Sequence, residues 1–530
     1  MTDAPEVPAP DASAAAARIA AGYATDGPAI DLGSVLLDGS PHPEAQVRMP
    51  LAMLNRHGLI AGATGTGKTK TLQLIAEQLS AAGVPVVLAD LKGDLAGLVQ
   101  PGEAGDRVTR RAADTGDPWV PTGCPVEFLA LGGLGTGVPV RATITDFGPV
   151  LLAKILDLND TQESSLGLVF HYADEAGLPL LDLKDLRAVL SWLTSDEGKA
   201  DLKGLGGLSP ATAGVILREL IALEDLGGDV FFGEPAWEPV DLLRTAPDGR
   251  GVISAVELMA VQDRPALFST FLMWLLAELF EELPEVGDLD RPKLVFFLDE
   301  AHLLFTGASK AFLEAVTQTV RLIRSKGVGV FFVTQNPTDV PSSVLGQLGN
   351  RVQHALRTFT PEDADALRKT VRTFPASPDY ELGELLTALG TGEAAVTVLS
   401  ERGAPTPVAW TMLRAPRSSM GAVEESVRAD VVAASPLQAR YGAAIDRESA
   451  YERLAGRLAP RPTPAPAPSP EAPEPRRERA PSRRREPERS EGGVVGAVLG
   501  SSAFRAFARS AASALGREIS RGVFGTRRRR

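Results

Sequence analysis

The stretch GLIAGATGTGKTKTLQLIAEQL, residues 58–79, decides the fold. Its first four residues predict a short buried strand, and residues 71–79 predict a helix. The segment between them, GATGTGKT, fits the pattern G-x-x-x-x-G-K-[ST], in which backbone N–H groups wrap a phosphate and the helix N-terminus faces its charge. We therefore predict a phosphate-binding loop formed by Gly62, Ala63, Thr64, Gly65, Thr66, Gly67, Lys68, Thr69 and Lys70.

A second apolar run, LVFFL at residues 294–298, is followed directly by Asp299 and Glu300. A buried strand that ends in two carboxylates is typical of a Walker B element. Lys68 would then neutralise the β- and γ-phosphates of ATP, and Thr69 and Asp299 would place Mg²⁺. Glu300 would polarise the attacking water, so the residues needed for hydrolysis are present.

Polar residues also follow two other strand candidates. The run FFVTQNP, residues 331–337, carries Gln335 at a position where a side chain can sense the γ-phosphate, with Thr334 as the second candidate. The turn DLKGD, residues 90–94, follows the strand candidate at 85–89. Ligands of open α/β sheets bind at the carboxyl ends of strands, so a carboxylate in this turn would lie near the loop.

Strand and helix patterns alternate along most of the chain. This order predicts an α/β fold with a mostly parallel sheet, and the short, nearly continuous apolar strands predict that both faces of the sheet are covered. The segments 394–399 and 407–411 predict a closing hairpin. The strand candidates are 58–61, 85–89, 125–129, 251–256, 293–298 and 328–333, and helices are expected at 150–158, 162–176 and 211–226.

Composition and charge limit the remaining possibilities. The 530 residues carry a net charge of −13 and include one cysteine, Cys124, so a disulfide scaffold is excluded. No apolar run is long enough for a membrane span, and the start of the chain lacks a secretory signal pattern, so a cytoplasmic protein is expected. Residues 460–530 contain 16 arginines and seven acidic residues, whereas the part of the chain before them is strongly acidic. Any contact with a polyanion must therefore be local.

These patterns predict seven segments. They are a disordered tail at 1–28, the first part of an ATPase core at 29–147, an all-helical insertion at 148–248, the second part of the core at 249–420, a helical extension at 421–459, a disordered Pro/Arg-rich linker at 460–491 and a basic amphipathic helix with an arginine tail at 492–530. The five histidines and the single cysteine show no zinc-ligand spacing, so Mg²⁺ at the nucleotide is the one metal predicted.

The combination of the DLKGD turn, the two Walker elements and VTQNP resembles the HerA/FtsK superfamily of hexameric motor ATPases, and within it the bacterial HerA-like group. The strings LNRHGLIAG (54–62), LNDTQ (158–162) and RAPRSSMG (414–421) belong to this resemblance, which covers about residues 31–420. It implies a RecA-like P-loop core that forms a homohexamer and hydrolyses ATP, with DNA as a candidate track for a helicase or translocase.

In this superfamily an arginine finger acts on the ATP of the neighbouring subunit. The matching position is Arg324, with Arg351 as the second candidate. Two departures bear on DNA translocation. The residues before Met49 are too few for the N-terminal β-barrel of HerA proteins, and 231 positions separate Lys68 from Asp299.

Three other interpretations remain open. Asp299-Glu300-Ala301-His302 spells the box of a superfamily of monomeric helicases, but the second RecA-like domain and its finger motif do not fit the rest of the chain. A nucleotide-dependent assembly or regulatory ATPase that moves no nucleic acid would suit the acidic body. The C-terminal basic helix could also dock on a subunit, bind nucleic acid or anchor the protein peripherally to a membrane.

Overall fold

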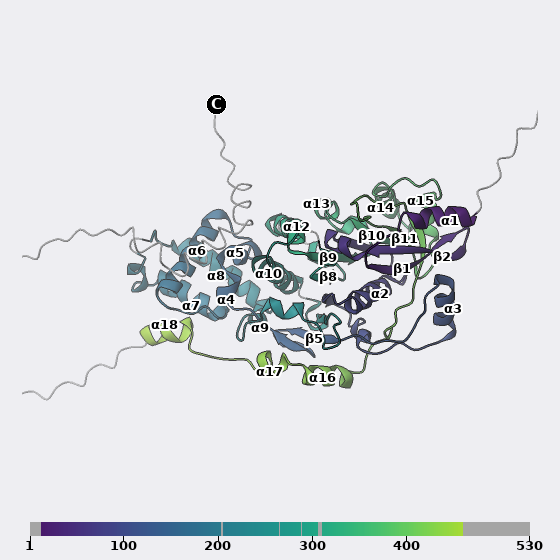
Figure 1. Cartoon of the computed structure of the whole chain (residues 1–530). Helices are drawn as coiled ribbons and strands as arrows, with labels where there is room; N and C mark the ends of the chain where they lie inside the picture. Colours follow the sequence, from purple (N-terminus) through teal and green to yellow (C-terminus); the bar gives the residue numbers. More distant parts are fainter. Residues whose placement is uncertain (1–11, 203–204, 264, 288, 306–309, 459–530) are drawn as a thin grey trace, which may run out of the picture. The chain divides into compact units, whose positions relative to one another are not determined.

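A computed structural model describes residues 12–202, 205–263, 265–287, 289–305 and 310–458 (Figure 1). The chain divides into two compact units. Unit 1 comprises Met1–Asn159 and Arg218–Asp446, and unit 2 comprises Asp160–Leu217 and Arg447–Arg530. The segments 460–491 and 492–530, for which a linker and a basic helix are predicted, lie outside the described residues.

Unit 1 is built on one twelve-stranded sheet with the order β2-β1-β12-β11-β10-β3-β9-β8-β4-β7-β5-β6. The strands are β1 (Ala29–Leu37), β2 (Ser40–Pro50), β3 (Gly58–Ala61), β4 (Val86–Asp90), β5 (Val126–Leu131), β6 (Val138–Val140), β7 (Ile253–Glu257), β8 (Leu294–Leu298), β9 (Val328–Thr334), β10 (Asn350–Gln353), β11 (Glu393–Thr397) and β12 (Ala409–Leu413). All six predicted central strands are present, and the predicted hairpin is β11–β12.

The sheet has a parallel part and an antiparallel part. Pairs from β10 to β6 are parallel, whereas β10–β11, β11–β12, β12–β1 and β1–β2 are antiparallel. In the parallel part the loop-bearing strand β3 lies between β10 and β9, and β9 separates it from β8. This is the strand order of a RecA-like core, and the α/β prediction is confirmed.

The helices of unit 1 are α1 (Ala12–Ala21), α2 (Lys68–Ala81), α3 (Asp106–Thr115), α4 (Ile144–Phe147), α5 (Pro149–Ile155), α9 (Gly228–Phe231), α10 (Pro265–Glu282), α11 (His302–Phe305), α12 (Lys310–Ile323), α13 (Ser342–Leu345), α14 (Pro361–Val371), α15 (Leu382–Ala388), α16 (Glu425–Ala434) and α17 (Gln438–Tyr441). The core joins α2 to the central strands through buried side chains such as Ile60, Leu72, Val86, Val295 and Phe331. This packing fixes the start of α2 against the end of β3.

The prediction of a disordered tail over 1–28 is wrong for residues 12–28. Helix α1 buries Ala15, Ala16 and Ile19 in the core cluster of the sheet. Just beyond it, the Tyr23 hydroxyl donates to Val396 O at 2.7 Å and also contacts Pro407 O. The alanine-rich composition concealed a short apolar stripe that docks as a helix because a tyrosine anchors its end.

Unit 2 is helical in its described part. It contains α6 (Asp160–Glu175), α7 (Leu183–Thr194) and α18 (Ala450–Leu458), while α8 (Pro210–Asp225) crosses the boundary between the units. The Asp201 carboxylate accepts from the Trp192 indole at 3.0 Å and from the Tyr172 hydroxyl at 2.8 Å. These bonds tie the loop after α7 back to α6, so the helices expected in this region are present.

Candidate nucleotide site

The loop between β3 and α2 is held by neighbouring backbones. Gly62 N donates to Thr334 O at 3.2 Å, and Ala63 N donates to Ala355 O at 2.8 Å. Gly62 has a φ of +153°, and a Cβ at this position would lie 2.4 Å from His354 Cβ. Only glycine allows this close approach of two backbones, which positions the loop at the carboxyl end of β3.

Lys68 lies inside the curve of the loop, at the first position of α2. Its ammonium donates to Gly62 O at 2.7 Å and to Ala63 O at 3.1 Å, and the residue is buried. Burial lowers the pKa of Lys68, and the negative charges of Glu300 and Asp299 oppose that shift. The structure therefore brings the predicted lysine of the loop and the predicted Walker B acids into one electrostatic environment.

Asp299 follows β8 and has one carboxylate oxygen that the fold does not use. Oδ1 accepts from Glu300 N at 2.9 Å, whereas the buried Oδ2 has no hydrogen-bond partner among the described residues. Burial, followed by the charge of Glu300, raises the pKa of Asp299 to about 7. A buried and unsatisfied carboxylate oxygen is costly unless a cation reaches it, so this donor fits Mg²⁺.

The half-buried Thr69 follows Lys68 in the first turn of α2 and supplies the second predicted metal ligand. In the described part of the chain, no group of three or more His, Cys, Asp or Glu side chains could hold a metal ion on its own. A cation at Thr69 and Asp299 would therefore need further oxygen ligands from phosphate or water.

Glu300 contacts a residue to which sequence reasoning assigned no role. Its Oε1 pairs with the ammonium of Lys92, and its Oε2 lies 3.2 Å from His302 Nδ1. Glu300 has a φ of +47°, a left-handed conformation that is uncommon for residues other than glycine. The signal for Lys92 was its place in a turn that follows the strand next to β8.

The two candidates at the end of β9 have different environments. Thr334 is fully buried, and its hydroxyl donates to Asp339 Oδ2 at 2.9 Å. Gln335 is exposed and lines an open cavity of about 360 Å³ with His302 and Phe305. Thr334 thus stabilises the following turn, and Gln335 is the one that can approach a bound group.

Arg324 lies at the other edge of the sheet. It begins the 3₁₀ segment Arg324–Lys326, which precedes β9, and β9 runs parallel to β3 and β8. A seven-residue strand spans about 20 Å at ~3.3 Å per residue, so this distance separates Arg324 from the loop edge. Arg324 is exposed. It therefore cannot reach the nucleotide site of its own chain.

Arg351, the second finger candidate, lies on β10 and has its donors committed. Its guanidinium donates to Thr373 O at 3.0 Å, and to Leu345 O and Leu348 O at 3.4 Å each. Burial lowers the pKa of Arg351. These contacts indicate a structural role in holding the segments on either side of β10.

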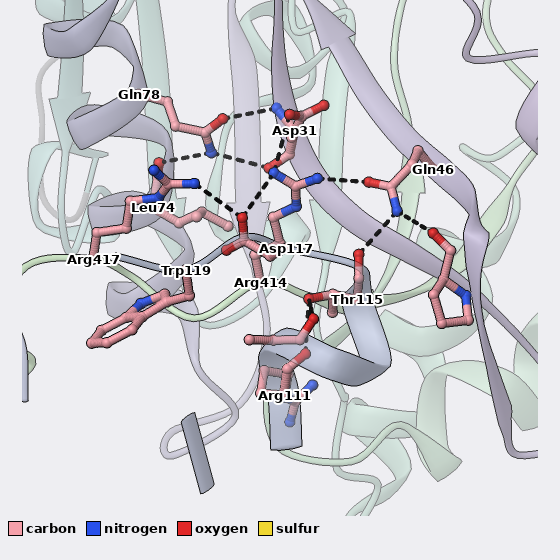
Figure 2. A network of polar contacts seen from close by, with 12 residues as sticks. Asp31, Gln46, Leu74, Gln78, Arg111, Thr115, Asp117, Trp119, Arg414 and Arg417 are labelled. Atoms are coloured by element: carbon pink, nitrogen blue, oxygen red, sulfur yellow. Dashed lines mark hydrogen bonds and ion pairs between the residues drawn. The ribbon is translucent and has the colours of Figure 1, made fainter. Parts of the chain in front are cut away.

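The string RAPRSSMG, residues 414–421, forms a strap that lies along α2. Arg414 joins Asp31 at 3.0 Å and Asp117 at 3.3 Å, and Arg417 also reaches Asp117 at 3.0 Å (Figure 2). Figure 2 shows the two arginines converging on the Asp117 carboxylate. This network attaches the start of the strap to β1 and to the loop after α3.

The rest of the strap runs along one face of α2 towards the phosphate-binding loop. The Glu77 carboxylate accepts from Arg417 N and from both the backbone and the hydroxyl of Ser418. Gln73 then donates to Ser419 O at 2.6 Å, and Lys70 donates to Met420 O at 2.6 Å. Positions 70, 73 and 77 share one helix face, so they act as successive anchors. No role for this string could be predicted from its sequence.

The sequence comparison assigns the family. The profile of the helicase HerA-like C-terminal family matches residues 36–530. The chain belongs to this family. No curated protein sequence matches it.

Solved structures with a similar arrangement are distant. The bacterial conjugative coupling protein TrwB, in its unbound form, has 16% sequence identity and a TM-score of 0.49, and the match covers 77% of this chain and 95% of TrwB. TrwB with the ATP analogue ADPNP gives 17% identity, a TM-score of 0.49 and coverage of 77% and 95%. VirB4 of Thermoanaerobacter pseudethanolicus gives 16%, a TM-score of 0.41 and coverage of 74% and 97%. The family assignment therefore rests on the sequence profile.

No helix in the described residues could cross a membrane.

Proposed function

We propose that this HerA-like chain binds Mg·ATP and hydrolyses it by in-line attack of water. The observation that carries the proposal is the unsatisfied, buried Oδ2 of Asp299, in the same electrostatic environment as Lys68 and Glu300. Glu127 and Glu257 also keep a buried oxygen without a partner among the described residues, so what distinguishes Asp299 is that its charge acts on the lysine of the loop. A nucleotide site leaves it open for a cation.

Each residue then has a defined task. The backbone of residues 62–70 surrounds the phosphates, and Lys68 neutralises the charge of the β- and γ-phosphates. Thr69 and Asp299 would hold Mg²⁺, which would supply further charge neutralisation. Glu300 accepts a proton as the water oxygen bonds to the γ-phosphorus and the bond to the ADP oxygen breaks. Gln335 holds the water in line.

Two substitutions test this assignment. Lys68→Ala should lose nucleotide binding, whereas Glu300→Gln should bind ATP and fail to turn it over, with a rate at least about 10²-fold lower. Binding is measured by calorimetry and turnover by phosphate release. Glu314→Gln, on the exposed face of α12, is the matched control and should retain the wild-type rate. Equal rates for wild type and Glu300→Gln would remove Glu300 as the base.

We further propose that the site is completed between subunits of a ring, most simply a hexamer. The position of the exposed Arg324 at the opposite edge supports this, because a neighbouring subunit could bring such an edge to the ATP. Sedimentation with and without ATP tests assembly. A wild-type monomer that hydrolyses ATP at full rate would overturn the ring.

DNA is the proposed track, and an assembly or regulatory ATPase without a nucleic-acid track is the alternative. The family match supports the first, and the net charge of −13 favours the second. ATPase rates with and without double- and single-stranded DNA, at two salt concentrations, distinguish them. Real stimulation should fall with salt because phosphate contacts release counterions. No stimulation by either DNA favours the alternative.

A further inference from the structure

Lys92 is presented to the nucleotide site by a rigid turn. The turn follows β4, which pairs in parallel with β8, so Lys92 and the Walker B acids lie at the same edge of the sheet. The Asp90 carboxylate accepts from Lys92 N at 3.2 Å, Gly93 N at 2.7 Å and Leu95 N at 3.0 Å. Asp90 is fully buried and therefore shapes the turn, leaving the side chain of Lys92 to project from it.

The side chain of Lys92 is half exposed, while its partner Glu300 has only 9% of its side chain exposed. The Lys92 ammonium occupies Oε1 of Glu300, and His302 Nδ1 faces Oε2. One oxygen of the proposed base is thus paired with an ammonium, whereas Oε2 has no hydrogen-bond partner among the described residues. An oxygen that is paired with an ammonium is not available to accept a proton from water.

Charges around Lys92 come from three elements. Burial alone would lower the pKa of Lys92. The hydrogen bond and charge of Glu300, together with the charges of Asp299 and Asp94, outweigh that effect, so the pKa of Lys92 is raised overall. The positive charge of Lys92 in turn lowers the pKa of Lys68. Two ammonium groups thus share the edge at which the phosphates are expected, and one of them is paired with the base.

We propose that Lys92 is a second γ-phosphate-binding lysine, which exchanges the Glu300 carboxylate for the γ-phosphate and so frees Glu300 to activate water. This inference rests on the proposed function. The γ-phosphate carries more negative charge than one carboxylate, so it competes well for the ammonium. ADP has no such group, and with ADP the lysine stays on Glu300. Lys92 thereby distinguishes the substrate from the product.

The test compares the non-hydrolysable analogue AMP-PNP with ADP, by calorimetry on the full chain with Mg²⁺. Lys92→Met should weaken AMP-PNP binding at least about tenfold, as expected for a charge-assisted bond, and change ADP binding by less than about twofold. Lys92→Arg should keep AMP-PNP binding within about threefold of wild type because it keeps the charge. Lys326→Met, at the opposite edge, should change neither affinity.

A combined variant separates the contact of Lys92 with the phosphate from its ion pair with Glu300. In the Glu300→Gln background, Lys92→Met should still weaken AMP-PNP binding, because the lost contact is with the phosphate. Equal weakening of AMP-PNP and ADP would overturn the proposal and make Lys92 a structural part of the turn. Unchanged AMP-PNP affinity would also overturn the proposal, because Lys92 would then pair with Glu300 without contacting the γ-phosphate. If the wild-type chain binds neither nucleotide, the proposed function itself fails, which is a distinct result.

Discussion

Asp299 and Arg351, at opposite ends of the parallel strands, use their polar groups differently. At the carboxyl edge, beyond β3 and β8, Asp299 keeps a buried oxygen without a partner among the described residues. At the amino edge, the Arg351 guanidinium donates to three backbone carbonyls. The unpartnered oxygen of Asp299 has a desolvation cost that a bound cation can offset, whereas the donors of Arg351 are satisfied by carbonyls of the same chain. We infer that Asp299 binds a ligand and that Arg351 supports the fold.

Arg324 also lies at the amino end of the strands, and it is exposed. The largest expected effect comes from Arg324→Ala. An arginine finger contributes about 10³–10⁵ in rate, so the variant should retain ATP binding and lose at least about 10³-fold in turnover. Phosphate release measures the rate, and calorimetry measures the binding.

Mixing tests whether Arg324 acts on the neighbouring subunit. Subunits with Arg324→Ala keep an intact phosphate-binding loop, and subunits with Lys68→Ala keep an intact arginine. Mixed rings should recover part of the activity, since some interfaces combine the two intact groups. Rings that sedimentation shows to be mixed and that still hydrolyse no ATP would exclude a trans role for Arg324.

Arg351→Ala should act on stability and leave the chemistry intact. Losing a charged donor to three carbonyls should lower the free energy of unfolding by roughly 3 kcal/mol. Turnover per folded subunit should stay within about threefold of wild type. Denaturant titration and active-site counting give the two numbers. A folded and stable Arg351→Ala ring with no turnover would instead make Arg351 the finger.

The fold could be predicted because strands buried on both faces leave continuous apolar runs, which locate six central strands. The phosphate-binding loop and the Walker B acids could be predicted for a related reason, since each follows such a strand directly. Gln335 was ranked above Thr334 from the sequence, but the environment of each could not be predicted, because a continuous apolar run does not show where the strand ends. The burial of Thr334 and its bond to Asp339 distinguish it from the exposed Gln335.

Contacts between residues far apart in the chain could not be predicted from the sequence. Lys92 and Glu300 are separated by 208 positions, and Arg417 and Glu77 by 340. Neither pair lies within a single element, so no periodicity connects its members. The docking of α1 was missed for the same reason, because the residues that receive Tyr23 lie 373 and 384 positions away.

Binding at the carboxyl edge should also depend on pH. The pKa of Asp299 is raised to about 7, and a cation requires the ionised form. Mg·ATP affinity should therefore be constant well above pH 7 and fall by up to tenfold per pH unit below it, about hundredfold between pH 8 and pH 5. Asp299→Asn removes this component and leaves only the titration of ATP itself. Parallel curves for the two proteins would show that Asp299 does not control binding.

Glu77 provides the matched contrast to Asp299. Its pKa is also raised to about 7 by burial, but its oxygens accept from Arg417 and Ser418, so the fold uses them fully. Because the folded pKa lies above the ordinary value near 4.5, the stabilisation from Glu77 is complete below that value and is lost as the pH rises through about 7. Glu77 should thus govern the stability of the strap, whereas Asp299 governs binding.

Replacing Glu77 by glutamine should remove that titration. Between pH 5.5 and pH 8, wild type should lose about 2 kcal/mol of unfolding free energy relative to Glu77→Gln, measured by denaturant titration at both pH values. Other buried acids cancel in this difference because both proteins contain them. Saturating Mg·ATP should leave it unchanged, since no oxygen of Glu77 awaits a ligand. A difference that disappears with Mg·ATP would mean that the strap senses the nucleotide, and the contrast between the two acids would then fail.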